Sequence, residues 1–292
     1  MFALNFNKTV MHIFYEKVAL IDHLKSIGTT NFKIGFVPTM GALHQGHLSL
    51  MQKSLLENDS TVVSIFVNPT QFNNKEDLDK YPRTLEDDIR KISTLSDQII
   101  LFAPTVDDIY EGSILSHPFD FDGLENQMEG KFRPGHFDGV GTIVKRLFEI
   151  VTPTNAYFGE KDFQQLQIVK KMVSKSSLKV NVIGCPIYRE SNQLAMSSRN
   201  ERLTANEREE AAVIYKTLAL AKEKFETNSA KEVSEWVIKT FEKNEHFTLE
   251  YFQIADEATL LPCVRKTQNK KYRAFIAVFI NNIRLIDTIS LN

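Results

Sequence analysis

Short apolar runs alternate with helix-type patterns over the first two-thirds of the chain, and this alternation limits the possible folds more than any other feature. Between the first two runs, Leu48, Met51 and Leu55 recur at helical spacing. Further helical patterns cover Thr84–Leu95 and the segment around Leu166. Strands alternating with helices predict a parallel sheet with helices on both faces. The runs with the length and composition of strands are Lys33–Thr39, Thr61–Asn68, Ile99–Ala103, Ala156–Gly159 and Val180–Ile183.

The pattern changes after about residue 186. Thr204–Phe225 predicts one long, charged amphipathic helix, and Ala230–Asn244 predicts a second helix. Helices followed by meandering strands indicate a separate, smaller α+β domain. We therefore predict two domains, residues 1–186 and residues 187–292. The strands expected in the second domain are Leu249–Ala255, Tyr272–Phe279 and Ile283–Ile289, with Asn281-Asn282 as the hairpin turn between the last two.

Charge and composition exclude several classes of partner. The 292-residue chain has a formal net charge of −2, which provides no bulk positive field for nucleic acid or an acidic membrane. The longest apolar run, Ala274–Ile280, is too short to cross a bilayer, and Met1–Lys8 lacks the pattern of a signal peptide. Cys185 and Cys263 form no C-x-x-C pair. We expect a cytoplasmic protein that binds neither nucleic acid nor membranes.

The segment Pro38–His47 (PTMGALHQGH) lies directly between a predicted strand and a predicted helix. Open α/β sheets bind ligands at this edge, and a helix N-terminus favours an anion. Gly41 and Gly46 allow the backbone to approach a ligand closely. His44 and His47 can donate hydrogen bonds to phosphate oxygens as charge develops. The alternative interpretation is a tight turn that carries two surface histidines.

The spacing His44-Gln45-Gly46-His47 is similar to the H-x-G-H signature of Rossmann-like enzymes that attack the α-phosphate of ATP. Nucleotidylyltransferases and class I aminoacyl-tRNA synthetases share this signature, so the motif predicts adenylyl transfer as the reaction class. Competing nucleotide motifs are absent from the sequence. It contains no P-loop, and Gly139-Val-Gly141 lacks the third glycine of a dinucleotide fingerprint.

Two polar side chains follow this segment at predicted element ends. Gln71, in Ile65–Phe72, comes after a strand and is expected beside the histidine loop. Its carboxamide can donate and accept, which suits two small polar substrates, although a turn-capping role is an alternative. In the segment YPRTLEDD, Thr84 is a predicted helix N-cap. Asp87 either completes this cap or is an oxygen ligand for magnesium on ATP.

Glycine-rich and basic residues gather in Glu129–Gly141, which includes Arg133 and His136. This segment could be a basic flap that closes over an anionic intermediate and excludes water. The equal alternative is a surface loop that leads into a helix over Val140–Phe148.

Two later segments carry groups that suit phosphate binding. Gly159–Asp162 lies at a strand-to-helix junction, where Lys161 can place a charge on a phosphate and Asp162 can cap the helix or hold a ribose hydroxyl. Leu194–Arg199 (LAMSSR) combines two hydroxyls with Arg199, which can bind two phosphate oxygens at once. For the second segment, a helix N-cap is the alternative.

Taken in order, these blocks resemble the pantothenate synthetase family over roughly residues 10–290. The matching blocks are PTMGALHQGH, VNPTQF, YPRTLEDD, GKFRPGHFDGVGTIV, GEKDFQQ, LAMSSRN and LEYFQIADEATLL. The resemblance implies a Rossmann-like nucleotidyltransferase-type domain with a smaller α+β domain. It also implies condensation of pantoate with β-alanine, driven by ATP and magnesium, with release of AMP and pyrophosphate by a cytoplasmic homodimer. Thr70 stands where some members have methionine, and Asn192-Gln193 stands where the family commonly has Asp-Gly, so the turn there is expected to differ slightly.

The resemblance also implies roles for individual residues. It assigns catalysis to His47, His44, Lys161 and Arg199. It places pantoate at Gln71 and Gln165, β-alanine at Gln71 and magnesium at Asp87. The ATP site implied by the resemblance comprises Met40, Gly41, Ala42, Leu43, His44, Gln45, Gly46, His47, Gly159, Glu160, Lys161, Asp162, Tyr188, Met196, Ser197, Ser198 and Arg199.

The expected mechanism has two half-reactions, in which a carboxylate attacks the α-phosphorus and an amine then attacks the acyl-adenylate. A nucleotidylyltransferase is the alternative enzyme, and it would keep AMP on its product. A non-catalytic ATP-binding sensor on the same fold is the alternative from another class, and it would form no AMP. The ligase prediction requires His47, Lys161 and Arg199 to meet in one cleft.

Overall fold

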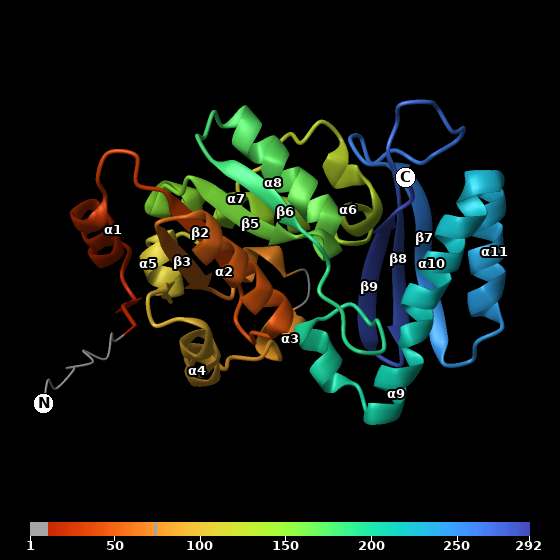
Figure 1. The fold of residues 1–292 in the computed structure, drawn as a ribbon, viewed down its shortest axis with the longest axis horizontal. Coiled ribbons are helices and arrows are strands. Elements are labelled where there is room, and N and C mark those ends of the chain that lie inside the picture. The colour runs from red at the N-terminus through yellow and green to blue at the C-terminus, as the bar shows by residue number, and fades with distance from the viewer. Residues whose placement is uncertain (1–10, 73–74) are drawn as a thin grey trace, which may run out of the picture.

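The computed structural model describes residues 11–72 and 75–292. Met1–Lys8, in which we predict no signal peptide, lies outside the described residues. Strands and helices alternate through the first part of the chain, with η marking single 3-10 turns (Figure 1): β1 (Ile13–Phe14), α1 (Lys17–Ile27), β2 (Ile34–Thr39), α2 (Gln45–Glu57), β3 (Ser60–Ile65), η1 (Pro69–Gln71), α3 (Lys75–Asp79), α4 (Leu85–Leu95), β4 (Ile100–Phe102), α5 (Val106–Tyr110), η2 (Leu124–Asn126), α6 (Met128–Phe132), α7 (His136–Val151), β5 (Asn155–Gly159), η3 (Glu160–Asp162), α8 (Phe163–Lys175) and β6 (Asn181–Cys185).

The second part begins with helices and ends with strands. Its elements are η4 (Ser198–Arg202), α9 (Ala205–Glu210), α10 (Ala212–Thr227), α11 (Ala230–Glu242), β7 (Phe247–Asp256), β8 (Tyr272–Ile280) and β9 (Ile283–Ser290). The three strands form an antiparallel sheet in the order β7-β8-β9. Residues 281–282 form the predicted hairpin turn, since Ile280 pairs with Ile283 across it.

The first sheet is parallel and has the strand order β1-β4-β3-β2-β5-β6. The chain moves outward from β2 through β3 to β4, and then returns to add β5 on the other side of β2. The order of the strands therefore reverses between β2 and β5. In open α/β sheets, ligands bind outside the carboxyl ends of the strands at such a switch point. Thr39 and Gly159 end the two strands at this point.

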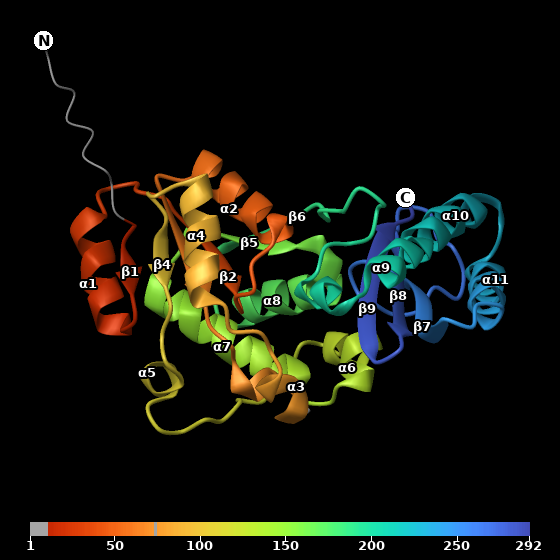
Figure 2. The ribbon, with the colours of Figure 1, turned by 90° about the horizontal axis from the view of Figure 1, so that it is seen from below.

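Helices cover both faces of the parallel sheet, as the sequence predicts (Figure 2). One apolar cluster joins α1, α7 and α8 to one face, with Phe36, Phe102 and Phe158 pointing into it. A second cluster joins α2 and α4 to the other face through Met51 and Ile92. The two faces need different side chains because successive residues of a strand point to opposite sides of the sheet. The predicted fold class is confirmed.

The predicted long helix over Thr204–Phe225 is wrong in one respect, since it is two helices that meet at Ala211. α9 has a capping box between Thr204 and Glu207 and buries none of its residues. α10 instead packs an apolar face, including Ile214 and Leu218, onto the antiparallel sheet. Helix stability in proteins comes mainly from packing. Because α9 has no apolar face to bury, no packing energy favours a continuous helix in which α9 would share the axis of α10.

Partly buried ion pairs join the two parts of the chain. The guanidinium of Arg284 on β9 contacts Glu129 of α6 at 2.7 and 2.8 Å, and it also contacts Glu250 of β7. Arg273 on β8 donates to Glu160 of η3 at 3.2 Å. The division into residues 1–186 and 187–292 stays a prediction. It is compatible with β6 ending at Cys185 and with the second apolar cluster containing no residue before 194.

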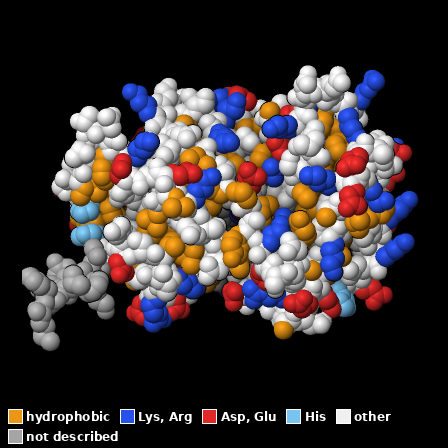
Figure 3. Space-filling view, in the orientation of Figure 1, with side chains coloured by type: hydrophobic (Ala, Val, Ile, Leu, Met, Phe, Trp, Pro, Cys, Tyr) orange, Lys and Arg blue, Asp and Glu red, His pale blue; other side chains and the backbone are white. Residues whose placement is uncertain are grey.

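The face shown in Figure 3 carries both signs of charge interspersed, and it is hollowed near its centre, between the two parts of the chain. Across residues 11–72 and 75–292, none of the helices combines the length and apolar character needed to cross a bilayer.

Candidate active site

A cleft opens at the switch point between β2 and β5, with a cavity volume of about 240 Å³. It lies where the carboxyl ends of both strands meet residues 186–199 from the second part of the chain. The cleft brings together residues from every block that the sequence singled out as a phosphate site. The predicted site residues that line it are Met40, His44, Gly46, His47, Gln71, Gly159, Lys161, Asp162, Gln165, Tyr188, Met196, Ser197, Ser198 and Arg199.

The turn between β2 and α2 is held from behind by Asp88, which is fully buried on α4. Its carboxylate accepts hydrogen bonds from the backbone N–H groups of Ala42 at 2.9 Å and Leu43 at 2.7 Å. Gly41 and Ala42 have positive φ angles of 82° and 48°, so the turn has a left-handed conformation that costs free energy at Ala42. Asp88 therefore stabilises a strained turn, and these two N–H groups are engaged inside the protein.

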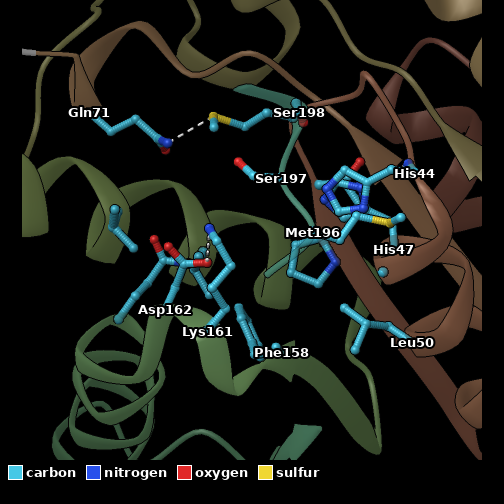
Figure 4. A pocket seen from close by; sticks show the side chains of 18 of the residues that line it. His44, His47, Leu50, Gln71, Phe158, Lys161, Asp162, Met196, Ser197 and Ser198 are labelled. Carbon is cyan, nitrogen blue, oxygen red and sulfur yellow. Dashed lines mark hydrogen bonds and ion pairs between the residues drawn. The ribbon is translucent and has the colours of Figure 1, made fainter. Parts of the chain in front are cut away.

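His44 and His47 stack against each other at the start of α2, with ring centroids 4.0 Å apart (Figure 4). The backbone N–H of His44 donates to Nδ1 of His47 at 3.4 Å. Because Nδ1 of His47 accepts this hydrogen bond, the proton of the neutral His47 ring is on Nε2. Nδ1 of His44 is buried and has no hydrogen-bond partner among the described residues. A Cβ at Gly46 would lie 3.0 Å from the His44 ring, which explains the need for glycine there.

Both imidazoles are neutral in the free protein near pH 7. Burial lowers the pKa of His44 to about 2, and the nearby His47, Lys161 and Lys91 lower it further in the same direction. Burial also lowers the pKa of His47 to about 4, with Lys161 acting in the same sense and Asp162 opposing it. Near pH 7 the two histidines are therefore neutral groups that can donate hydrogen bonds, and Lys161 and Arg199 bring positive charge to the cleft.

The junction between β5 and α8 presents Lys161 to the cleft. Its side chain is 16% exposed, and its Nζ lies 3.6 Å from the carboxylate of Asp162. Glu160 turns the other way, toward the buried guanidinium of Arg273, and does not line the cleft. Arg273 also stacks on the ring of Phe163, with 4.0 Å between the guanidinium carbon and the ring centroid. The lysine turn is thus held by the second part of the chain.

Gln71 extends from η1 into the cleft (Figure 4). Its Nε2 lies 2.8 Å from the sulfur of Met40, and its Oε1 lies 3.2 Å from Nδ2 of Asn68. The backbone carbonyl of Gln71 accepts from His136 Nδ1 at 2.8 Å. Gln165 lines the same cleft from one turn into α8.

The serine-rich segment of η4 closes the cleft from the second part of the chain. The Ser197 hydroxyl accepts from the Arg199 backbone N–H at 3.3 Å, so it acts as the N-cap of η4. The Ser198 hydroxyl donates to the carbonyl of Ala42 at 3.1 Å and thereby joins the segment to the histidine turn. Arg199 also lines an adjoining chamber of about 500 Å³, together with Lys161.

The glycine-rich segment Glu129–Gly141 is packed behind Gln71. α7 begins at His136, four residues earlier than the predicted helix over Val140–Phe148. A Cβ at Gly139 would lie 2.3 Å from the backbone oxygen of Thr70, so glycine is required for this close approach. The segment supports the turn that carries Gln71, and its basic residues Arg133 and His136 line a side chamber that also contains Gln71.

The structure does not bring every predicted residue to the cleft. Among the described residues, Gly41, Ala42, Leu43, Gln45 and Glu160 do not line it. Asp87, the predicted magnesium ligand, lies outside the cleft on the exposed side of α4, where it pairs with Arg90.

Sequence reasoning missed Asn68 and Asp88, both buried. For Asp88 the available signal was its place in α4, one residue beyond Asp87 and in step with the buried Ile92 four residues later.

The turn that departs from the family pattern keeps its hydrogen bonds. Gln193 has a positive φ of 75°, the conformation for which glycine is favoured. Asn192 accepts from the backbone N–H of Leu194 at 3.1 Å, as an aspartate could. The backbone N–H of Met196 donates to the Tyr188 carbonyl at 3.0 Å. Glutamine thus occupies a glycine conformation, and the strand-like pairing beside Tyr188 is retained.

A doubly wound parallel sheet, a cleft at its switch point and a histidine-bearing helix N-terminus define an α/β enzyme of the Rossmann-like class. The sequence model of the family described as pantoate-beta-alanine ligase matches residues 12–290. The chain belongs to this family, and its activity is that of a pantoate–β-alanine ligase, which forms pantothenate. The resemblance seen in the sequence is confirmed.

Named relatives agree with this assignment over full length. The chain is 68% identical over 281 residues to the pantothenate synthetase of Flavobacterium psychrophilum, covering 96% of this chain and 100% of the relative. It is 53% identical over 282 residues to that of Christiangramia forsetii, covering 97% and 100%.

Solved structures show the same fold. A pantothenate synthetase of Thermus thermophilus superimposes with a TM-score of 0.87 at 36% identity, covering 96% of this chain and 99% of that one. The Francisella tularensis enzyme, complexed with beta-gamma ATP and beta-alanine, gives a TM-score of 0.77 at 36% identity, covering 97% and 98%.

Proposed function

We propose that the chain performs its ligation in two half-reactions, with ATP as the activating substrate. In the first, a carboxylate oxygen of pantoate attacks the α-phosphorus, and the bond to the β-phosphate oxygen breaks, so pyrophosphate leaves. In the second, the amine nitrogen of β-alanine loses a proton and attacks the acyl carbon, which forms the C–N bond and releases AMP. The observation that carries this proposal is the convergence of His47, Lys161 and Arg199 on one cleft.

The cleft suits stabilisation of a charged transition state. Negative charge accumulates on the phosphate oxygens, and preorganised donors aimed at them are worth more in a partly buried site than in water. His44 and His47 would donate as neutral imidazoles, while Lys161 and Arg199 would supply fixed positive charge.

The remaining assignments divide the cleft among the substrates. We place the nucleotide against the residues of the implied ATP site that line the cleft, which are Met40, His44, Gly46, His47, Gly159, Lys161, Asp162, Tyr188 and Met196–Arg199. The engaged N–H groups of Ala42 and Leu43 mean that this turn would meet ATP through other atoms.

We assign pantoate to Gln71 and Gln165, and β-alanine to Gln71 within the adjoining side chamber. The Francisella relative, complexed with beta-gamma ATP and beta-alanine, supports two of these three ligands.

Magnesium would accompany ATP in this proposal. Across residues 11–72 and 75–292, no group of three or more His, Cys, Asp or Glu side chains gathers that could hold a metal ion. This fits magnesium, which is commonly held by one or two carboxylates together with substrate phosphates. Asp162 is the carboxylate that lines the cleft, and Asp87 is not placed to contribute. When bound, the ion would neutralise phosphate charge.

Two assays test the adenylation route. With ATP, magnesium, pantoate and β-alanine, mass spectrometry should identify pantothenate, free AMP and pyrophosphate in equal amounts. With pantoate and ATP alone, labelled pyrophosphate should exchange into ATP. A product that retains AMP would instead indicate a nucleotidylyltransferase, and absence of exchange in active enzyme would contradict a free adenylate.

We also propose a cytoplasmic homodimer, on the basis of the family resemblance. The free thiols of Cys185 and Cys263 agree with a reducing compartment. Light scattering coupled to size-exclusion chromatography would give the oligomeric state. A monomeric mass at micromolar concentration would contradict the dimer.

A further inference from the structure

The side-chain amide of Gln71 is oriented by a chain of hydrogen bonds that leads away from the cleft. Gln71 Oε1 lies 3.2 Å from Nδ2 of Asn68, which is 1% exposed. The same Nδ2 lies 3.2 Å from the backbone carbonyl of Gly139. A carbonyl can only accept, so the Asn68 atom facing it must be the NH₂ group. This contact sets which way both amides point, and Gln71 presents its own NH₂ group to the cleft, where it also contacts the sulfur of Met40 at 2.8 Å.

The other side of the Asn68 amide is held by a tyrosine. Tyr110, at the end of α5, is 2% exposed, and its hydroxyl donates to Asn68 Oδ1 at 2.6 Å. Burial raises the pKa of this phenol, so the hydroxyl keeps its proton and remains a donor. Thr70 lies 3.0 Å from the Tyr110 hydroxyl and 3.2 Å from Asn68 Oδ1. Asn68 thus meets donors on one side and acceptors on the other, which leaves its amide a single orientation.

Tyr110 itself is fixed by its surroundings. The guanidinium carbon of Arg146, on α7, lies 5.1 Å from the centroid of its ring, and Arg146 donates to the carbonyl of Ile109 at 3.0 Å. Phe66 packs on the ring with centroids 6.5 Å apart. Tyr110 does not line the cleft, so any effect on substrate must pass through neighbours that do. Its ring reaches the cleft through Phe66, and its hydroxyl reaches it through Asn68 and Gln71.

We propose that Tyr110 is a positioning residue for the ligation: through Asn68 it holds the Gln71 carboxamide with its N–H donors facing the substrate carboxylate or hydroxyl. The inference rests on the proposed function, because it takes Gln71 as the residue that meets pantoate. Without the tyrosine hydroxyl, Asn68 Oδ1 keeps only the longer contact to Thr70. The Gly139 carbonyl then holds the Asn68 amide mainly from its NH₂ side, so both amides rotate more readily, and Gln71 turns its acceptor oxygen toward an anionic substrate more often.

Tyr110→Phe removes the hydroxyl and keeps the ring, so packing in the core is preserved. We expect the KM for pantoate to rise about fivefold to tenfold, the scale of one lost hydrogen bond, with the KM for ATP changed less than twofold. Thr70→Val should give a smaller rise in the KM for pantoate. Tyr157→Phe is the matched control, because Tyr157 is also fully buried and donates to Glu57 at 2.9 Å, outside the cleft. It should leave both KM values unchanged.

A double-mutant cycle separates positioning from a general structural role. If Tyr110 acts through Gln71, then Tyr110→Phe should have no further effect on the pantoate KM in a Gln71→Ala background. A full additional effect in that background, or an equal rise in the ATP KM, would overturn the proposal. If Gln71→Ala raises the pantoate KM but Tyr110→Phe does not, only the positioning role fails. If Gln71→Ala itself leaves that KM unchanged, the placement of pantoate fails and the inference fails with it.

Discussion

Replacing Asp88 by alanine should loosen the histidine turn, and the neighbouring Asp87 provides a matched control. Asp88 is fully buried and accepts hydrogen bonds from the backbone of Ala42 and Leu43, whereas Asp87 is exposed and pairs with Arg90. The two residues are adjacent on α4 and chemically identical. Any difference between the variants therefore comes from where each side chain points.

The size of the effect follows from the two backbone bonds. A hydrogen bond to a charged group contributes about 1.5 to 3 kcal/mol, so the pair contributes about 3 to 6 kcal/mol. Removing the carboxylate also removes its own desolvation cost, so we expect a net loss of about 2 to 4 kcal/mol in the free energy of unfolding. Asp87→Ala breaks a solvent-exposed ion pair between residues three apart, so its effect on the free energy of unfolding should be small.

Urea unfolding followed by circular dichroism measures the global loss, and hydrogen exchange measures it locally. The amides of Ala42 and Leu43 should exchange faster in Asp88→Ala and normally in Asp87→Ala. Displacement of the adjacent His44 should lower pyrophosphate exchange about 10- to 100-fold, the scale of a small misplacement in an active site. Asp87→Ala should keep the magnesium dependence of the normal enzyme. An Asp88→Ala protein with unchanged stability, amide protection and turnover would refute the reasoning.

Two further residues give predictions from the same geometry. His47→Ala should lower the adenylation rate by about 10²- to 10³-fold, measured as pyrophosphate exchange, since one oriented donor is lost; unchanged exchange would contradict its role. The unfolded chain protonates this histidine near pH 6.5 and the folded chain near pH 4, so the unfolded state binds more protons between these values, and stability is lost as the pH falls through this window. Between pH 4 and pH 6.5, His47→Ala should therefore reduce the slope of the unfolding free energy against pH. The reduction should be less than about 1.4 kcal/mol per pH unit, because solvent in the cleft screens the charge. An unaltered slope in urea titrations would argue against a neutral His47 ring in the folded chain. Gln193→Gly should raise the free energy of unfolding by about 0.5 to 1 kcal/mol, since glycine adopts a φ of 75° without steric cost but is more flexible when unfolded; a decrease would show that the turn is not strained.

Local patterns were enough to predict the sheet and the edge where the cleft lies. Apolar runs of strand length marked β2 to β6, and the motifs around His44, Gln71, Lys161 and Arg199 all follow strand ends or open helices. Strand ends of a parallel sheet meet at one edge, so residues far apart in sequence could be expected in one site. The two-residue strand β1 was not predicted, because so short a segment carries no periodic signal.

What each side chain faces was decided only by the tertiary structure. The sequence analysis singled out Asp87, whereas the packing of α4 against the histidine turn directs the neighbouring Asp88 to that turn. Glu160 and Lys161 are adjacent, yet one meets Arg273 and the other lines the cleft.

The neutral state of the histidines is equally a consequence of burial, which a list of residue types does not contain. Composition and spacing determine which elements form. The direction in which a side chain points, its burial and its hydrogen-bond partners depend on contacts between segments that are distant in sequence. These contacts exist only in the folded chain.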